Sequence, residues 1–294
     1  MLPILALLTV QILFGLNYVA SKIILSEFPP LLWGAIRMCT AALLMFPFTF
    51  VVVPKKQRII STQFLGPVLL FSVFAIALNQ GFFLLGLKYT TTANSSILNT
   101  LAPVFTLVIA VLIGQEKFTP LRAMGVVVAF CGVVVLRKFE DFSLQSSTLK
   151  GDVYTLLNCL SLAIFFIISK DFLRRHSVLW VTAWMFLFGA IMLGLCSFGD
   201  WAAIHQVHLS TGLIQAMIYN IVAATIVTYY LNSWALVRVH SSMVALFIYL
   251  QPVVAVLFSW FVLSDPPTVR MFAAISFIFC GVLMGFAHKK KRFI

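Results

Sequence analysis

The stretch LNTLAPVFTLVIAVLIGQEKFTP, from Leu98 to Pro120, places a proline inside an apolar run that is otherwise long enough for one helix. Pro103 has no backbone N–H, and its ring clashes with the carbonyl four residues earlier, so helix interiors normally exclude it. The same arrangement recurs 149 residues later (103 to 252), in FIYLQPVVAVLFSWFVLSDPPT from Phe247 to Thr268, where Pro252 takes the matching place. Two such stretches in one chain indicate an internal duplication.

The composition indicates that lipid is the solvent of this chain. Apolar residues make up 62% of the sequence and charged residues 10%, whereas soluble domains contain about 25% charged residues. A helix needs about 20 apolar residues to cross a bilayer. The sequence contains ten such segments, at residues 3–25, 31–53, 64–87, 95–114, 121–136, 151–169, 178–198, 212–234, 242–263 and 269–286. We therefore predict an all-α polytopic membrane protein with ten transmembrane helices and no separate soluble domain.

An alignment of the chain with itself predicts two halves. Residues 101–133 match residues 250–282 without a gap at eight positions, and a fainter match pairs Ser21-Lys22 with Ser169-Lys170. The identical residues of the first segment are Leu101, Pro103, Val104, Thr119, Phe130, Cys131, Gly132 and Val133. We predict a first five-helix repeat at 1–136, a connecting loop at 137–150 and a second five-helix repeat at 151–294, which ends in a basic tail. Because each half has an odd number of spans, the two repeats are inverted copies around a central cavity.

The basic residues predict the orientation. If both termini are cytoplasmic, thirteen Lys and Arg residues fall on the inner side and five on the outer side, as the positive-inside rule requires. The same asymmetry accounts for the formal net charge of +12, which would otherwise suggest a nucleic-acid partner. We expect instead a multi-pass protein of the inner (plasma) membrane that contacts anionic headgroups and binds no nucleic acid.

Five asparagines lie at similar depths in five different predicted spans, displaced from the midpoints toward the outer face. An amide that faces lipid costs several kcal/mol, so each of these side chains must face protein or water. For any single asparagine the alternative is a hydrogen bond between two helices, but five together favour a polar chamber. The predicted substrate-binding residues are Asn17, Asn79, Gln80, Asn99, Asn158, Asn220, Tyr249 and Gln251.

Pro103 and Pro252 lie at the midpoints of their spans, where we predict that they interrupt the helix beside the chamber and act as hinges. The alternative is a packed kink without motion. The matching glycines Gly132 and Gly281 predict a close approach between helices. Lys22 and Arg37 lie near the outer ends of the first two spans. We predict that they supply positive charge to the outer vestibule, the alternative being side chains that extend to the interface.

The residues also exclude several kinds of chemistry. No Asp or Glu lies in the middle of a predicted span, so the usual intramembrane proton carrier is missing. The chain has neither an HExxH nor a GxSxG motif, which argues against an enzyme. Its five cysteines lack the spacing of metal ligands. We expect no cofactor and no metal.

The two proline-containing stretches, extended in both directions, resemble a known family. Residues 86–135, GLKYTTTANSSILNTLAPVFTLVIAVLIGQEKFTPLRAMGVVVAFCGVVV, are similar to the fourth and fifth spans of the EamA-type family in the drug/metabolite transporter superfamily. Residues 235–284, ALVRVHSSMVALFIYLQPVVAVLFSWFVLSDPPTVRMFAAISFIFCGVLM, look like its ninth and tenth spans. FGLNYVASKIILSEFPPLLWGAIRM resembles its opening, including Arg37. The chain departs from the pattern at Asp265, where the family usually has Glu.

This resemblance implies ten helices around a cavity lined mainly by spans one, three, four, six, eight and nine. It also implies the export of amino acids, other small metabolites or drugs. We therefore expect a transporter for a small polar or amphipathic metabolite, with an amino acid as the first candidate. We expect export by alternating access and facilitated diffusion, in a monomer or weak dimer. The alternatives are multidrug efflux and, in another class, a membrane scaffold or sensor that transports nothing.

Overall fold

The computed structural model describes residues 2–90, 95, 98–136, 146–251, 253–254 and 269–287 of the 294-residue chain. Helices account for nearly all of this described part, which contains no strand. Pro252 and Asp265 lie outside the described residues, so the predicted hinge at Pro252 remains a prediction.

The first half begins with two long helices, followed by a third span that changes its helical pitch partway along. Its elements are α1 (Leu2–Leu25), α2 (Pro30–Val52), a short 3₁₀ turn η1 (Lys55–Gln57), α3 (Thr62–Ser72), the π-helical η2 (Val73–Leu78), α4 (Asn79–Tyr89), α6 (Ala102–Leu112) and α7 (Pro120–Leu136). The second half has a similar order of elements. They are α8 (Ser146–Arg175), α9 (Val178–Cys196), the 3₁₀ segment η4 (Phe198–Gln206), α10 (Thr211–Ile221), the π-helical η5 (Val222–Val227), α11 (Thr228–Leu236), α12 (Ser241–Leu246), the 3₁₀ turn η6 (Phe247–Tyr249) and α14 (Val269–Ala287).

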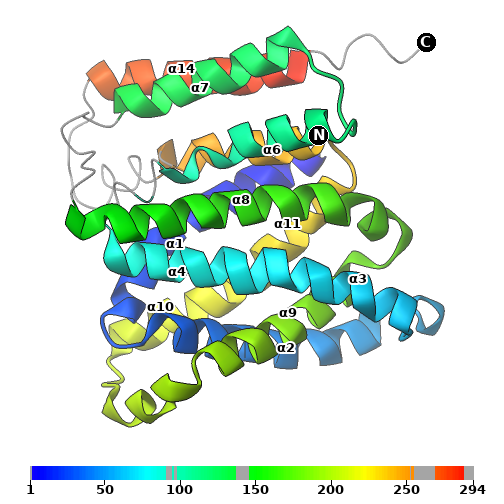
Figure 1. Ribbon diagram of the computed structural model, residues 1–294, viewed down its shortest axis with the longest axis vertical. Coiled ribbons are helices and arrows are strands. Elements are labelled where there is room, and N and C mark those ends of the chain that lie inside the picture. Colours follow the sequence, from blue (N-terminus) through cyan, green and yellow to red (C-terminus); the bar gives the residue numbers. More distant parts are fainter. Residues whose placement is uncertain are drawn as a thin grey trace.

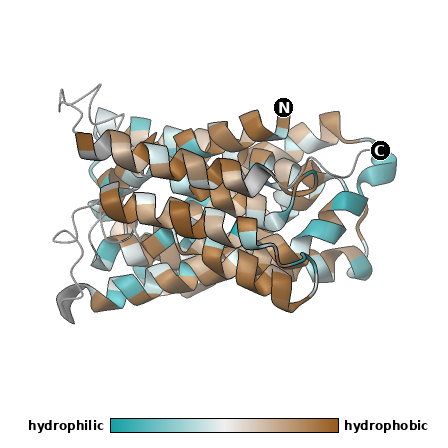
Figure 2. Ribbon diagram, turned by 90° about the horizontal axis from the view of Figure 1, so that it is seen from above, coloured by the Kyte–Doolittle hydropathy of each residue, from teal (hydrophilic) through white to brown (hydrophobic). Residues whose placement is uncertain are grey.

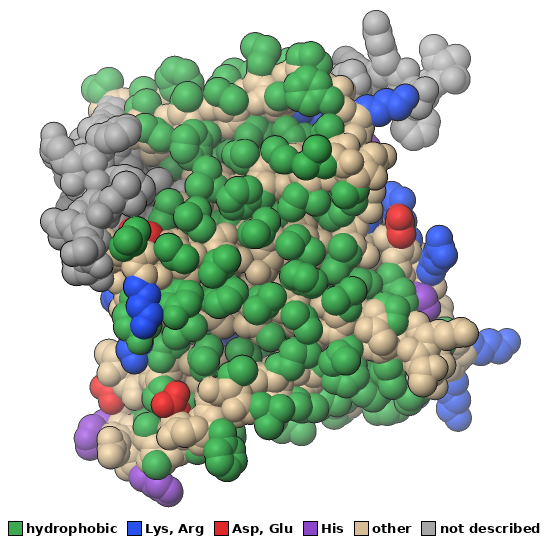
Figure 3. Space-filling model, in the orientation of Figure 1, with side chains coloured by type: hydrophobic (Ala, Val, Ile, Leu, Met, Phe, Trp, Pro, Cys, Tyr) green, Lys and Arg blue, Asp and Glu red, His purple; other side chains and the backbone are tan. Residues whose placement is uncertain are grey.

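Six helical segments are long and apolar enough to cross a membrane. They are Leu2–Leu25, Pro30–Val52, Thr62–Tyr89, Thr148–Arg175, Val178–Cys196 and Thr211–Leu236. These segments correspond to predicted spans one, two, three, six, seven and eight. In three of the other four predicted spans the apolar stretches of the described helices, Ala102–Leu112, Pro120–Val135 and Phe272–Met284, are shorter. Hydrophobic side chains cover the face seen in Figure 3, and the charged side chains gather at its two ends. The same separation is visible from above in Figure 2. This surface is what a lipid-embedded protein requires.

Helices from the two halves pack against each other in pairs. Helix α2 packs on α9, α4 on α8, and α7 on α14, while α1 packs on α10 and α11. In Figure 1 the α7–α14 pair lies at the top of the bundle, α4 and α8 lie in the middle, and α2 and α9 lie at the bottom. The bundle interior is therefore built jointly by both halves.

The α7–α14 pair depends on two glycines, as the sequence predicted. A Cβ added to Gly132 would lie 2.9 Å from the carbonyl oxygen of Ala274, and one added to Gly281 would lie 2.5 Å from that of Gly125. Because both obstructing atoms belong to the backbone, they cannot rotate away as a side chain could. The predicted close approach at both glycines is confirmed.

The irregular helical segments recur at the same spacing as the sequence repeat. The π segments η2 and η5 begin 149 residues apart (73 to 222), inside the third and eighth predicted spans. The fourth predicted span is also interrupted: a helical segment ends at Asn99, and α6 begins at Ala102 with Pro103 in its first turn. Proline is tolerated there because the first turn has no hydrogen-bond partner for that N–H. The boundary between these helical segments lies next to Pro103, and the role of Pro103 as a hinge remains a prediction.

Candidate functional site

A cavity of about 60 Å³ lies at the centre of the bundle, between helices of the two halves. Its wall contains six of the eight residues predicted to bind substrate. They are Asn17, Asn79, Gln80, Asn99, Asn158 and Gln251. The other two, Asn220 and Tyr249, are fully buried and do not line the cavity. Among the described residues, the Tyr249 hydroxyl has no hydrogen-bond partner.

The amides on the wall bond to one another. The Asn79 side-chain amide donates to the Asn158 side-chain oxygen and, at 3.2 Å, to its backbone carbonyl. Gln80 donates through Nε2 to Oδ1 of Asn79 at 2.9 Å. Asn158 in turn donates to Oδ1 of Asn99 at 3.3 Å, and Asn99 donates to the Tyr18 hydroxyl at 2.7 Å. Four predicted residues and Tyr18 therefore form one continuous hydrogen-bonded chain.

Arg37 extends this chain to the remaining asparagines. Its guanidinium donates to Oε1 of Gln80 and, at 3.0 Å, to Oδ1 of Asn220. The Asn220 amide donates to Oδ1 of Asn17. Because Asn17 and Tyr18 are neighbours on α1, the hydrogen bonds form a circuit that starts and ends on the same helix. We call it the amide circuit: Asn17, Asn220, Arg37, Gln80, Asn79, Asn158, Asn99 and Tyr18.

The predicted place of Arg37 at the outer vestibule is wrong. Its side chain is buried, with 1% of its surface exposed. Burial of a guanidinium is tolerable only with good acceptors, and the oxygens of Gln80 and Asn220 supply them. Lys22 is exposed near the end of α1, and its ammonium donates to the carbonyl of Leu87 at 3.1 Å; its role at the outer vestibule stays a prediction.

The two π segments lie directly beside the amide circuit. Segment η2 ends just before Asn79 and Gln80, and η5 begins two residues after Asn220. The hydroxyl of Tyr229 donates to the carbonyl of Ala75 within η2 at 2.9 Å. Segments of π helix are frequent at functional sites because they displace side chains from the regular helical positions.

Sequence reasoning missed several residues of the cavity wall, including Gln11, Asn232 and Ser233. Gln11 accepts a hydrogen bond from Gln251 at 2.8 Å. Both Gln11 and Asn232 satisfy the criterion applied to the asparagines, a polar amide inside an apolar span. Asn232 lies near the end of the segment Thr211–Leu236, whereas Gln11 lies as close to the middle of α1 as Asn17 does.

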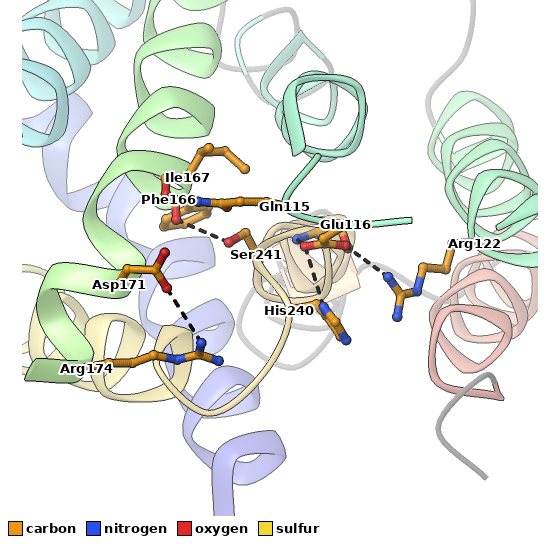
Figure 4. Close-up of polar contacts among 10 residues, drawn as sticks. Gln115, Glu116, Arg122, Phe166, Ile167, Asp171, Arg174, His240 and Ser241 are labelled. Carbon is orange, nitrogen blue, oxygen red and sulfur yellow. Dashed lines mark hydrogen bonds and ion pairs between the residues drawn. The ribbon is translucent and has the colours of Figure 1, made fainter. Parts of the chain in front are cut away.

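One end of the cavity is closed by contacts around Glu116, at the end of the bundle where α8 finishes and α12 begins. We call this the Lys170 end and the opposite one the Lys22 end. Figure 4 shows Glu116 between the start of α12 and Arg122 of α7. Its carboxylate accepts from Arg122 at 3.0 Å and from the backbone N–H of Ser242 at 3.1 Å, and the Ser242 hydroxyl also donates to it. A carboxylate at a helix N-terminus is favourable because that end carries partial positive charge.

The loop around Glu116 therefore joins the two halves. Gln115 adds a hydrogen bond to the carbonyl of Ile167 at 2.9 Å, and Ser241 bonds that of Phe166 at 3.2 Å. We call these contacts the Glu116 latch. Chemically, the amide circuit offers neutral donors and acceptors, and no group of three or more His, Cys, Asp or Glu residues in the described part of the chain is placed to hold a metal.

Comparisons with known proteins agree with this architecture. A model described as the EamA-like transporter family matches the chain twice, at residues 1–138 and 149–286. A chain of known crystal structure superposes with a TM-score of 0.78 at 17% identity, covering 95% of this chain and 94% of that one. At this identity, the likeness shows a shared fold.

The relatives include transporters from bacteria and archaea. The uncharacterized transporter YoaV of Bacillus subtilis (strain 168) is 24% identical over 280 residues, 95% of each chain. An uncharacterized transporter of Archaeoglobus fulgidus is 28% identical over 65% of this chain and 66% of its own length. The WAT1-related protein At3g18200 of Arabidopsis thaliana is 23% identical over 89% of this chain and 75% of its own length. Since the family model accounts for both halves, the chain belongs to the EamA-like transporter family and is a multi-pass membrane transporter.

Proposed function

We propose that this transporter moves a small polar or amphipathic metabolite through the central cavity, with an amino acid as the first candidate and export as the direction. The observation that carries the proposal is the amide circuit, because it places neutral donors and acceptors from both halves around one cavity. An amino acid presents both a donor and an acceptor group, and amide side chains can bind each of them.

The size of the cavity supports alternating access. About 60 Å³ is far below the roughly 300–1,000 Å³ typical of ligand pockets. A metabolite enters only if the halves move apart at one end. The Glu116 latch holds the Lys170 end together, so its release is the movement that opens this end.

We propose ten spans in two inverted repeats. Equal spacing of the π segments supports this proposal, and so does the pairing of α2 with α9 and of α7 with α14. The count of Lys and Arg supports cytoplasmic termini in an inner (plasma) membrane. In that orientation the Lys170 end faces the cytoplasm. No carboxylate lines the cavity within the described residues, which supports facilitated diffusion rather than proton coupling.

The decisive experiment is counterflow in proteoliposomes loaded with one unlabelled amino acid at a time. We expect at least one loaded amino acid to drive accumulation of its labelled form above that in protein-free liposomes. Accumulation of cationic drugs but of no amino acid would point to multidrug efflux. Failure with every small solute, together with specific retention of a protein partner, would support a scaffold or sensor and overturn the proposal.

A further inference from the structure

A second pocket, of about 400 Å³, lies at the Lys170 end beyond the Glu116 latch. Its lining includes Gln115, Lys170, Asp171, Arg174, Arg238 and His240. Figure 4 shows Asp171 and Arg174 of α8 on one side and His240 on the other. We propose that this pocket binds the carboxylate or phosphate group of an anionic solute, with Lys170 as its anchor.

The pocket lies close to the central cavity. Lys170 is four residues after Phe166 on α8, and His240 is four residues before Val244 of α12; Phe166 and Val244 both line the central cavity. Four residues of α-helix span about 6 Å. The second pocket is therefore about one helical turn beyond the floor of the first, with the Glu116 latch between them.

Lys170 is the observation that points to a ligand. Its surface is 7% exposed, it lines the pocket, and within the described part of the chain it makes no hydrogen bond or ion pair. Most of the side chain is buried while its ammonium group reaches the pocket, and a partly desolvated cation is stabilised by an anion that binds beside it. The carboxylates that act on it electrostatically are Glu116 and Asp171. Both already have partners, in Arg122 at 3.0 Å and in Arg174 at 3.6 Å. An incoming anion would supply the missing partner.

Two guanidinium groups reinforce the positive charge. Arg174 donates through Nε to the carbonyl of Val237 at 3.2 Å, and Arg238 stacks over the ring of Trp234 at 3.8 Å while donating to its carbonyl at 2.7 Å. These contacts hold both side chains in place but use few of their five N–H donors. With Lys170 they give three cations against the single lining carboxylate of Asp171. A soluble anion that approaches this end therefore meets a fixed positive site.

The sequence repeat gives Lys170 a counterpart. The pair Ser169-Lys170 matches Ser21-Lys22, and Lys22 is exposed at the opposite end of the bundle. The two matching lysines thus lie at opposite ends of the bundle. This assignment names a substrate class, solutes with a carboxylate or phosphate group, and in that respect rests on the proposed function.

The test is a thermal-stability titration of the purified full-length protein in lipid-free detergent, with phosphate and succinate as probes and chloride at matched ionic strength. We expect a saturable rise in Tm for wild type. Lys170→Gln should raise the probe concentration needed for half-saturation by about tenfold or more, because it removes a charge-assisted hydrogen bond. Lys170→Arg should retain binding, and the control Lys56→Gln, which removes an exposed lysine of η1, should match wild type.

Equal titrations for Lys170→Gln and Lys56→Gln would overturn the site. If Lys170→Gln does not fold, Arg238→Gln serves as the second variant, with a weaker loss expected.

A second arm separates soluble anions from lipid headgroups. In nanodiscs of phosphatidylcholine and of phosphatidylglycerol, succinate should raise Tm equally. The succinate-induced rise in Tm could instead be lost only in phosphatidylglycerol, and native mass spectrometry could show less bound lipid on Lys170→Gln than on wild type. These two results together would assign the pocket to a lipid headgroup and overturn the substrate class. Binding that depends on Lys170 without any counterflow leaves the site standing and rejects the proposed function. If neither counterflow nor anion binding changes in Lys170→Gln, the anion site is rejected and the proposed function stands.

Discussion

Asn79 on α4 and Asn158 on α8 are joined by two hydrogen bonds, one to the side chain and one to the backbone carbonyl. These residues come from different halves of the chain, and both face the central cavity. The same amides that could bind a substrate therefore hold the halves together in this conformation. A substrate that enters the cavity competes with an internal hydrogen bond, and such competition couples binding to a change of shape.

Replacing either asparagine should weaken substrate binding and reveal this coupling. Asn79→Leu or Asn158→Leu removes a hydrogen bond to the ligand, which should lower affinity by about 5–150-fold. Both changes remove the same side-chain hydrogen bond between the two residues, so the double variant should lose less stability than the two single losses combined. Substrate Kd and Tm in detergent measure the two effects. Thr182→Val on α9, where the hydroxyl bonds only the carbonyl of Val178 among the described residues, is the matched control. Unchanged Kd in destabilised variants would show that these asparagines are structural.

Arg37→Met should destabilise the protein more than any exposed cationic substitution. The oxygen of Gln80 would lose its Arg37 donor, and a buried polar atom left unpaired costs about 1–3 kcal/mol. The oxygen of Asn220 would lose one of two donors, because it also accepts from the indole N–H of Trp33 at 3.0 Å. Lys22→Met removes an exposed lysine and should change stability by about 0.5 kcal/mol or less. Thermal unfolding, monitored by fluorescence-detected size-exclusion chromatography, compares the melting temperatures of the two variants. Equal melting of both variants would contradict the role assigned to Arg37.

Glu116→Gln should favour opening at the Lys170 end. The substitution keeps the shape of the side chain but removes the charge that holds Arg122 and the N-terminus of α12. A cysteine at Val244, in a background without the five native cysteines, reports access to the cavity wall. We expect maleimide labelling from that end to become severalfold faster. Asp200→Asn removes an exposed carboxylate of η4 and should leave the rate unchanged; acceleration in both variants would indicate a general charge effect.

Gly281→Ala should separate α7 from α14. The added Cβ would meet backbone atoms of Gly125 and Ala129 at 2.5 Å, and overpacking of this kind costs about 1–3 kcal/mol. The control is Gly194→Ala in α9, where an added Cβ meets nothing within 4 Å and helix propensity improves by up to about 1 kcal/mol. The Tm values should move in opposite directions. A neutral Gly281→Ala variant would show that this helix pair adjusts freely.

Transport should continue when the proton gradient is collapsed with the substrate gradient held fixed. The amide side chains and Arg37 around the cavity keep the same protonation state near neutral pH, so they cannot carry a proton across the membrane. Counterflow with and without a protonophore measures this. Transport that stops with the gradient would direct attention to His240, 3.9 Å from Glu116.

The sequence predicted the helices well because apolar length depends only on local composition. It also nominated six of the eight asparagines and glutamines in the cavity wall, since an amide in an apolar span must face protein or water. It could not predict the amide circuit, in which Asn17 and Asn220 meet across 203 residues. Arg37 was misplaced for the same reason: whether a guanidinium turns outward or inward depends on acceptors from distant helices. Neither π segment has a signal in composition.

Those π segments have a mechanical consequence. A π turn holds one more residue than the α-helical turn it replaces, so each of the two helices stores one spare residue beside the cavity. If η2 tightened to α-helix, everything beyond it would rotate by about 100° and shift by about 1.5 Å, which carries Asn79 and Gln80 off the wall together. Faster amide hydrogen exchange in residues 73–78 and 222–227 than in the flanking turns would reveal such a screw motion. Uniform exchange along these helices would exclude it.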